Sequence, residues 1–75
     1  MDNSTFRIRP YSKRELARLY FPNTPSDDSA VANFRLWIRR NNEVMEKLQA
    51  AGYRSHSKIF TPKQVRILVE TFGEP

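Results

Sequence analysis

The sequence contains no cysteine, and this absence removes several kinds of site at once. A chain without cysteine forms no disulfide, binds no metal through thiolates and has no cysteine nucleophile. Its only glycines, Gly52 and Gly73, are too few and too far apart for a glycine-rich phosphate loop. The single histidine, His56, has no carboxylate near it in sequence that would orient it for catalysis. We therefore expect a protein that is not an enzyme, with no cofactor and no metal site.

Long apolar runs are also missing from the sequence. No stretch approaches the ~18 apolar residues of a membrane span, and the first ten residues have no apolar core of signal-peptide length. Together with the lack of cysteine, this predicts a cytoplasmic protein that has no membrane partner. The 75 residues are expected to form one small domain that is frayed over residues 1–4. The core of so small a domain is marginal, and dimerisation would help to stabilise it.

Positive charge exceeds negative charge in this chain. Thirteen Lys and Arg residues stand against eight Asp and Glu residues, which gives a net charge of +5 and a pI near 10.1. Such a balance favours polyanionic partners, but it also aids solubility without any partner. Both interpretations of the charge stay open at this stage.

The stretch from Ala30 to Asn42 has the periodicity of an amphipathic helix. At 100° per residue, one face holds Ala30, Val31, Phe34, Trp37, Ile38 and Asn41, while Arg35, Arg39, Arg40, Asn33 and Leu36 fall elsewhere. The apolar face carries the only Trp of the chain, so Trp37→Ala is expected to lower the free energy of unfolding by about 3 to 5 kcal/mol. The arginines make the same helix the best candidate for contact with a partner.

Helix-start signals divide the rest of the chain. Ser12 and Glu15 form a capping box that predicts a helix from Lys13 to Phe21, ended by Pro22, with Lys13, Arg14 and Arg18 facing water. Ser26 or Asp27 is expected to cap the helix that carries Trp37. The carboxylates of Asp27 and Asp28 are expected to complement the positive end of its dipole.

Two further helices follow from similar signals. Asn41 or Asn42 breaks the chain before a helix from Glu43 to Ala51, and Gly52 supplies the left-handed position after it. Thr61 and Gln64 repeat the capping box with Pro62 at the first helical position, which predicts a helix from Pro62 to Phe72. Ile67 lies off the buried face expected for that last helix.

Two segments have the pattern of short extended structure. Apolar and basic residues alternate from Thr5 to Pro10, which predicts an edge strand. The segment from Tyr53 to Phe60 has aromatic or β-branched ends around a polar middle, as in a small hairpin or wing. Its residue Ile59 is expected to pair with the strand around Phe6 to Ile8.

The predicted fold is therefore mainly α: four short helices in a helix-turn-helix-like bundle with a minimal β-strand pair or wing. Its expected core consists of large apolar residues from all four helices and from the end of the wing. These are Leu16, Leu19, Tyr20, Phe34, Trp37, Ile38, Leu48, Phe60, Val65, Leu68 and Val69.

The order of the elements predicts how nucleic acid would be bound. A capped short helix, a turn and a second helix with an arginine-rich outer side follow the order of a helix-turn-helix, whose second helix enters the major groove of DNA. Three features weigh against DNA: the long connection after Pro22, the acidic start of the second helix, and the lack of a basic tail. The arginines are also explained as a solvated face, as on any surface helix. The candidate nucleic-acid-binding residues are Asn33, Arg35, Arg39 and Arg40 on the helix and Arg54 and Lys58 in the wing.

Several strings in the chain carry a resemblance to a known family. They are Tyr11-Ser12-Lys13 with Glu15-Leu16-Ala17, Tyr20-Phe21-Pro22, Trp37-Ile38, Ala51-Gly52-Tyr53 and Phe60-Thr61-Pro62. Over nearly its whole length the chain resembles a family of short uncharacterised proteins, a domain of unknown function abundant in Bacteroides-type bacteria. More distantly, the order of its elements is similar to excisionase-like and MerR-like winged helix-turn-helix domains. The first resemblance implies no activity, and the second implies DNA binding.

Two functions remain open from the sequence. The first is a small regulatory module that places the helix at residues 30–42 on double-stranded DNA. The second is a protein-interaction module or homodimer that uses Leu36, Ile67 and the neighbouring arginines as its contact surface. Neither function requires a small-molecule substrate.

Overall fold

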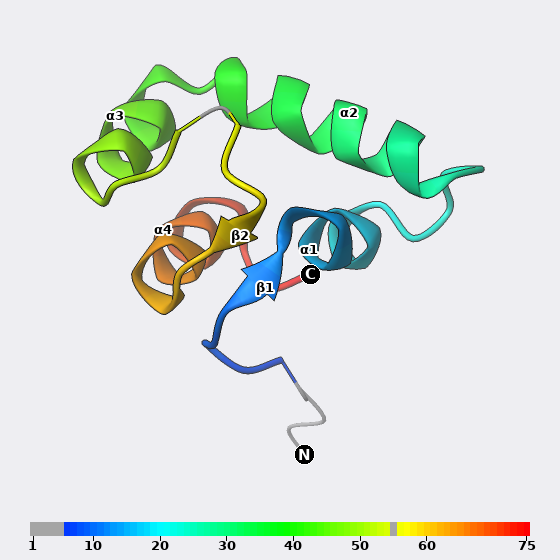
Figure 1. The fold of residues 1–75 in the computed structure, drawn as a ribbon, viewed down its shortest axis with the longest axis horizontal. Helices are drawn as coiled ribbons and strands as arrows, with labels where there is room; N and C mark the ends of the chain where they lie inside the picture. The colour runs from blue at the N-terminus through cyan, green and yellow to red at the C-terminus, as the bar shows by residue number, and fades with distance from the viewer. Residues whose placement is uncertain (1–5, 55) are drawn as a thin grey trace.

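The computed structural model describes residues 6–54 and 56–75, and within them the chain is mainly helical (Figure 1). The elements follow in the order β1 (Tyr11–Ser12), α1 (Lys13–Tyr20), α2 (Asp27–Arg39), α3 (Asn42–Ala50), β2 (Ile59–Phe60) and α4 (Pro62–Phe72). The four described helices and the two-stranded sheet confirm the prediction of a mainly α fold with a minimal strand pair. The fraying expected for residues 1–4 falls outside the described residues.

Both predicted capping boxes are present. The Ser12 hydroxyl accepts the Glu15 backbone N–H at 3.0 Å, and the Glu15 carboxylate accepts the Ser12 backbone N–H at 3.0 Å. At the start of α4, Thr61 and Gln64 make the same reciprocal pair at 3.3 and 3.0 Å. These local bonds satisfy backbone donors that the first turn of a helix leaves without a partner, so the sequence alone is enough to place both helix starts.

α2 begins one turn before the stretch that carries its apolar face. Ser26 caps it by accepting the Ser29 N–H at 3.1 Å, and Asp27 and Asp28 lie in the first turn as expected. Asp27 also pairs with Arg18 of α1, with 3.2 Å between carboxylate oxygen and guanidinium nitrogen. The acidic start of α2 is therefore tied to α1 across the connection formed by residues 21–26 (Figure 1).

The sheet differs from the prediction. Tyr11 pairs with Phe60 and Ser12 with Ile59 in antiparallel register, so the strand predicted over residues 5–10 is wrong and the partner of β2 lies further along the chain. The physical reason is that the chain folds back before β1. The Phe6 ring stacks on the Tyr11 ring at 5.2 Å, and the Tyr11 hydroxyl donates to the Arg7 carbonyl at 2.9 Å. Pro10, which has no N–H to donate, separates this fold from β1.

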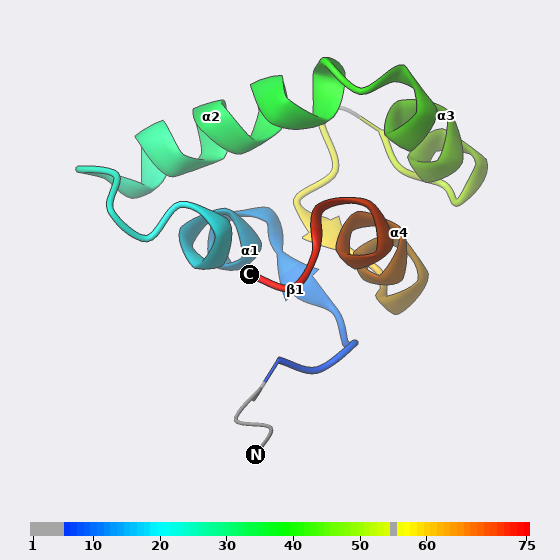
Figure 2. The ribbon, with the colours of Figure 1, turned by 180° about the vertical axis from the view of Figure 1, so that it is seen from behind.

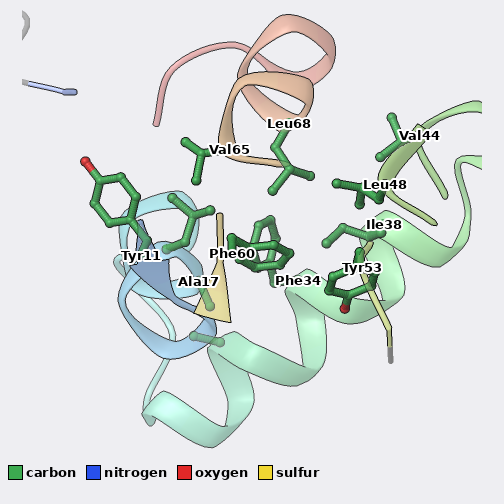
Figure 3. Packing of buried hydrophobic residues seen from close by; sticks show 12 residues of the cluster. Tyr11, Ala17, Phe34, Ile38, Val44, Leu48, Tyr53, Phe60, Val65 and Leu68 are labelled. Carbon is green, nitrogen blue, oxygen red and sulfur yellow. The ribbon is translucent and has the colours of Figure 1, made fainter. Parts of the chain in front are cut away.

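The core lies between α2 and α4, with Phe34 and Phe60 at its centre (Figure 3). Most of the predicted core residues are buried there, and five others join them. The buried apolar set is Tyr11, Leu16, Ala17, Ala30, Phe34, Ile38, Val44, Leu48, Tyr53, Phe60, Val65 and Leu68. Tyr20, Trp37 and Val69 pack against this set but are only partly buried, so Trp37 is not at the centre of the core.

α1 buries most of the face predicted for it but differs from the prediction at two residues. Leu19 is 44% exposed, whereas Lys13, predicted to face water, is 9% exposed. Lys13, Leu16, Ala17 and Tyr20 lie within about 100° of one another around an ideal helix, and Leu19 lies beyond Leu16, outside that arc. Ala17 is fully buried, so the side of α1 that holds Ala17 and Lys13 faces the rest of the molecule, and Leu19 does not.

Beside the core, four rings form what we call the aromatic seam, made of Tyr20, Phe21, Trp37 and Phe72. The Trp37 ring stacks on Phe72 at 3.9 Å and meets Tyr20 and Phe21 edge-on at 5.4 and 5.5 Å. The Tyr20 hydroxyl donates to the Gly73 carbonyl at 2.6 Å, which brings the end of α4 beside α1, as Figure 2 shows from behind. The seam thus joins α1, α2 and α4.

α3 is attached to α4 through a buried side chain. Gly52 has the predicted left-handed conformation, with φ of 92°, just after α3. The Gln64 side chain, 3% exposed, donates to the Ala51 carbonyl at 2.9 Å while it accepts the Thr61 N–H. One amide therefore caps the end of one helix and the start of another.

Candidate nucleic-acid interface

α2 turns its buried stripe, Ala30, Phe34 and Ile38, toward the core and leaves two flanks. By helical periodicity, Arg35 and Arg39 lie on one flank, and Asn33 and Arg40 lie on the other flank beside Trp37. All four of these polar side chains are exposed. The candidate residues on α2 are thus divided between two sides of the helix.

The flank with Arg35 borders a hollow of about 450 Å³, which we call the Lys58 hollow. Three segments meet around it: the start of α1, the middle of α2 and the residues that precede β2. Its lining consists of Ser12, Lys13, Arg14, Val31, Arg35, His56, Ser57 and Lys58. Val31 is the only apolar residue in this set, and four of the eight lining residues carry a permanent positive charge.

No Asp or Glu is found among the described residues that line the Lys58 hollow. Its permanent charges are those of Lys13, Arg14, Arg35 and Lys58. An Asp28 carboxylate oxygen lies 3.9 Å from the Arg14 guanidinium, and the two side chains are 95% and 65% exposed respectively. An ion pair so exposed contributes little, on the order of 0 to 1 kcal/mol, and leaves Arg14 able to change partners.

Two more hollows each share a lining residue with this one. One is lined by Arg35, Ile38, Arg39, Met45 and Tyr53, and the other by Met45, Gln49, Gly52, Tyr53, Arg54 and His56. The first shares Arg35 with the Lys58 hollow, and the second shares His56 with it. We call the three together the basic groove. Its permanent cations are Lys13, Arg14, Arg35, Arg39, Arg54 and Lys58.

The wall of the basic groove opposite α2 is held by short contacts. The Lys13 backbone N–H donates to the Lys58 carbonyl at 2.8 Å, which extends the strand pairing by one bond. The Lys13 ammonium lies 5.1 Å from the centre of the Tyr53 ring, a cation–π distance. Arg54 and Ser57 are bonded to each other: the Ser57 N–H donates to the Arg54 carbonyl at 2.9 Å, and the Arg54 N–H donates to the Ser57 hydroxyl at 3.2 Å.

The structure therefore brings four of the six predicted residues into one groove, and these are Arg35, Arg39, Arg54 and Lys58. It does not bring Asn33 and Arg40 there. Sequence reasoning missed Lys13 and Arg14, which were expected only to face water. The strand register brings Lys13 to the groove. Ser12 pairs with Ile59 in antiparallel register, so the next residue, Lys13, lies opposite Lys58.

The apolar surface predicted from Leu36 and Ile67 is not formed as expected. Ile67 is partly buried and packs against the core, so it does not lie off the buried side of α4. Leu36 is 48% exposed on the side of α2 away from its buried stripe. Leu36 therefore has no apolar partner in Ile67.

His56 is exposed and lines two of the hollows of the groove. Among the described residues, no three His, Cys, Asp or Glu side chains come close enough together to hold a metal ion. Over residues 6–54 and 56–75, none of the helices combines the length and the apolar character needed to cross a membrane.

Comparison with known proteins places the chain in a family. No curated protein and no solved structure matches the sequence. One family matches residues 7–75, which include every helix and strand of the fold. This agrees with the resemblance to an uncharacterised family that the sequence motifs indicate. The chain belongs to the family described as Domain of unknown function (DUF4248).

Proposed function

We propose that this protein is a non-enzymatic module that binds double-stranded DNA through the basic groove. The observation that carries the proposal is the concentration of charge. Six permanent cations from α1, α2 and the segment before β2 line one groove, and no Asp or Glu lies among its described lining residues. Phosphates contribute most of the affinity of a protein for DNA, and Lys and Arg side chains bind them.

The order of the helices supports the same proposal. α1 lies against α2, so the two helices follow the order of a helix-turn-helix, and the 13 residues of α2 span roughly 20 Å. An α-helix, about 10 to 12 Å in diameter with its side chains, fits the major groove of B-DNA, about 12 Å wide. The connection over residues 21–26 is longer than the common 3 to 4 residue turn.

The acidic start of α2 limits which part of the helix meets DNA. Asp27 and Asp28 are exposed and pair with Arg18 and Arg14 at 3.2 and 3.9 Å. Two carboxylates would repel phosphates at that end of α2. We therefore assign the contact to the second half of α2, through Arg35 and Arg39, together with Arg54 and Lys58 across the groove.

A protein-interaction module or homodimer is the alternative function. The large apolar side chains that are most exposed are Ile8, Leu19, Leu36 and Ile59, and each belongs to a different segment. Single exposed apolar residues are normal on a soluble surface. With Ile67 packed against the core, no specific contact favours this alternative over DNA binding.

Fluorescence anisotropy of a labelled mixed-sequence duplex tests the proposal. Binding is measured from about 50 to 200 mM salt for the wild type and for the double variant Arg35→Ala, Arg39→Ala. The wild-type affinity should fall steeply with salt, and the double variant should bind more weakly and lose about 1.8 from the slope of log affinity against log salt.

The matched control is Lys63→Ala, Arg66→Ala, which removes the same charge from exposed positions of α4. This variant should keep the wild-type salt slope. Equal losses in both variants would show that only net charge matters and would overturn the assignment to the groove. No binding by the wild type at low salt would overturn DNA binding itself.

A further inference from the structure

We infer that the Lys58 hollow is a binding site for a single phosphate group. Its identification as a backbone phosphodiester of DNA rests on the proposed function, whereas the site itself rests on the residues that line the hollow. The two statements can fail separately, and the experiment below separates them.

The charges around the Lys58 hollow come from three separate segments of the chain. Arg14 belongs to α1 and Arg35 to α2, and Lys58 is the residue directly before β2. Side chains along one helix or one loop face solvent without enclosing a volume, but these three border the same hollow of about 450 Å³. Cations held around one space repel one another, and an anion in that space removes the repulsion.

Two hydroxyl groups supply neutral donors in the same hollow. The Ser12 hydroxyl accepts the Glu15 N–H at 3.0 Å, and the Ser57 hydroxyl accepts the Arg54 N–H at 3.2 Å. A hydroxyl that accepts a hydrogen bond keeps its own O–H as a donor. The oxygens of Ser12 and Ser57 both accept backbone N–H groups, so each O–H can donate to an oxygen acceptor such as a phosphate.

The start of α1 does not make this site by itself. Its capping box already uses the Glu15 and Ser12 N–H groups, and the Lys13 N–H donates to the Lys58 carbonyl. The ligand is therefore selected by the side chains. Planar guanidinium groups such as those of Arg14 and Arg35 bind phosphate oxygens in pairs, which favours phosphate over a monatomic anion such as chloride.

The hollow is large and open enough for a phosphate that is part of a longer chain. Its volume is more than ten times the roughly 30 Å³ that a water molecule occupies. The other two hollows of the basic groove each share a lining residue with it, Arg35 in one and His56 in the other, so further cations lie beside the site. These neighbouring cations favour a phosphodiester, which is followed by further phosphates, over an isolated phosphate monoester.

NMR titration of the isotope-labelled protein tests the phosphate site. Sodium phosphate is compared with sodium chloride at equal ionic strength, and the signals followed are the backbone amides of Arg14, Ser57 and Lys58 and the side-chain Nε–H of Arg35. Phosphate should shift these signals together and saturably, and chloride should not. Shifts of equal size with both salts, or shifts spread over the whole surface, would overturn the site.

A pair of variants locates the effect. Arg35→Gln, Lys58→Gln should lower the phosphate affinity at least about tenfold, because two charge-assisted hydrogen bonds are lost. Lys63→Gln, Arg66→Gln removes the same charge from exposed positions of α4 and should leave the affinity unchanged. Equal affinity in the two variants would overturn the assignment to the Lys58 hollow.

A second ligand distinguishes the two sources of phosphate. The dinucleotide TpT, which has one phosphodiester and no phosphate monoester, should shift the same signals as inorganic phosphate. If phosphate binds and TpT does not, the site takes a monoester and its identification with the DNA backbone is wrong. If phosphate and TpT bind but no duplex does, the site stands and the proposed function fails. If the duplex binds the groove while neither small ligand does, the proposed function stands and the phosphate site fails.

Discussion

The two flanks of α2 meet the rest of the molecule in opposite ways. On one flank, Trp37 is covered by the rings of Tyr20, Phe21 and Phe72, the closest of them at 3.9 Å. On the other flank, Arg35 and Arg39 border open hollows whose described lining residues include several cations and no carboxylate. The same helix therefore has a closed aromatic side and an open charged side.

This difference separates the contacts that stabilise the fold from the charged side chains that the fold exposes at its surface. Contacts between buried rings favour the folded state by about 0.5 to 1.5 kcal/mol per pair beyond the burial of area. Cations gathered in a groove repel one another and add nothing to folding. Because stability does not explain the charged flank, that flank is the better place to look for a function.

The largest expected effect on stability comes from Phe34, which lies on the buried stripe of α2 between the two flanks. Phe34 is fully buried, and its ring lies 5.3 Å from Tyr20 and 5.8 Å from Phe60. Phe34→Ala should lower the free energy of unfolding by about 3 to 5 kcal/mol, most of the stability of so small a domain. Urea unfolding followed by circular dichroism measures this. A cooperative transition with a loss under about 1 kcal/mol would show that the core does not depend on α2.

The aromatic flank should be the next most sensitive. Trp37 is only partly buried, so Trp37→Ala should lower the free energy of unfolding by about 2 to 3 kcal/mol, less than the sequence alone predicts. Equilibrium unfolding in urea compares it with Phe34→Ala. A loss as large as that of Phe34→Ala would mean that the aromatic seam and the core are one unit.

Alkaline pH should weaken the same flank through Tyr20. Burial, and secondarily the charge of Glu74, raise the pKa of the Tyr20 phenol from 10.0 to about 12. The unfolded chain then releases the proton at a lower pH than the folded chain. The stabilisation is present in full below pH 10.0 and is lost as the pH rises toward about 12.

The predicted loss is about 1 to 2 kcal/mol, since partial exposure weakens the effect. It is measured as the free energy of unfolding of the wild type and of Tyr20→Phe across this pH range. Lysine titration contributes equally to both, so the variant should show the smaller decline. Identical declines would remove Tyr20 as the cause.

The smallest effect on stability is expected on the charged flank. Arg35→Ala, Arg39→Ala should change the free energy of unfolding by no more than about 0.5 kcal/mol per site, because both side chains are exposed and repel their neighbours. Thermal unfolding of the DNA-free protein measures this. A loss of several kcal/mol would mean that these arginines hold the fold and would end the contrast between the flanks.

Local signals explain how much of the fold the sequence predicts. Ser12 with Glu15, Thr61 with Gln64, and the glycine after α3 act over a few residues, so helix positions follow from the sequence. The strand predicted over residues 5–10 failed because an alternating pattern does not show that Phe6 stacks back on Tyr11.

The candidate site depends on contacts between distant residues, and the sequence shows it only in part. Periodicity separates Arg35 and Arg39 from Asn33 and Arg40, but it does not show which flank faces the wing. Lys13 enters the groove because its backbone bonds to Lys58, far along the chain. The sequence holds no local trace of that bond.

The strand pairing that forms this wall also determines how the protein opens. β1 and β2 join residues near the two ends of the fold with only two pairs, so the entropy lost on closing this long loop is offset by few bonds. We expect this sheet to open more readily than the helices, on the timescale read by amide hydrogen exchange. When it opens, Lys58 leaves Lys13 and the groove loses a wall. An anion bound there would therefore slow exchange of the Lys13 amide, and local unfolding and ligand release would be one event.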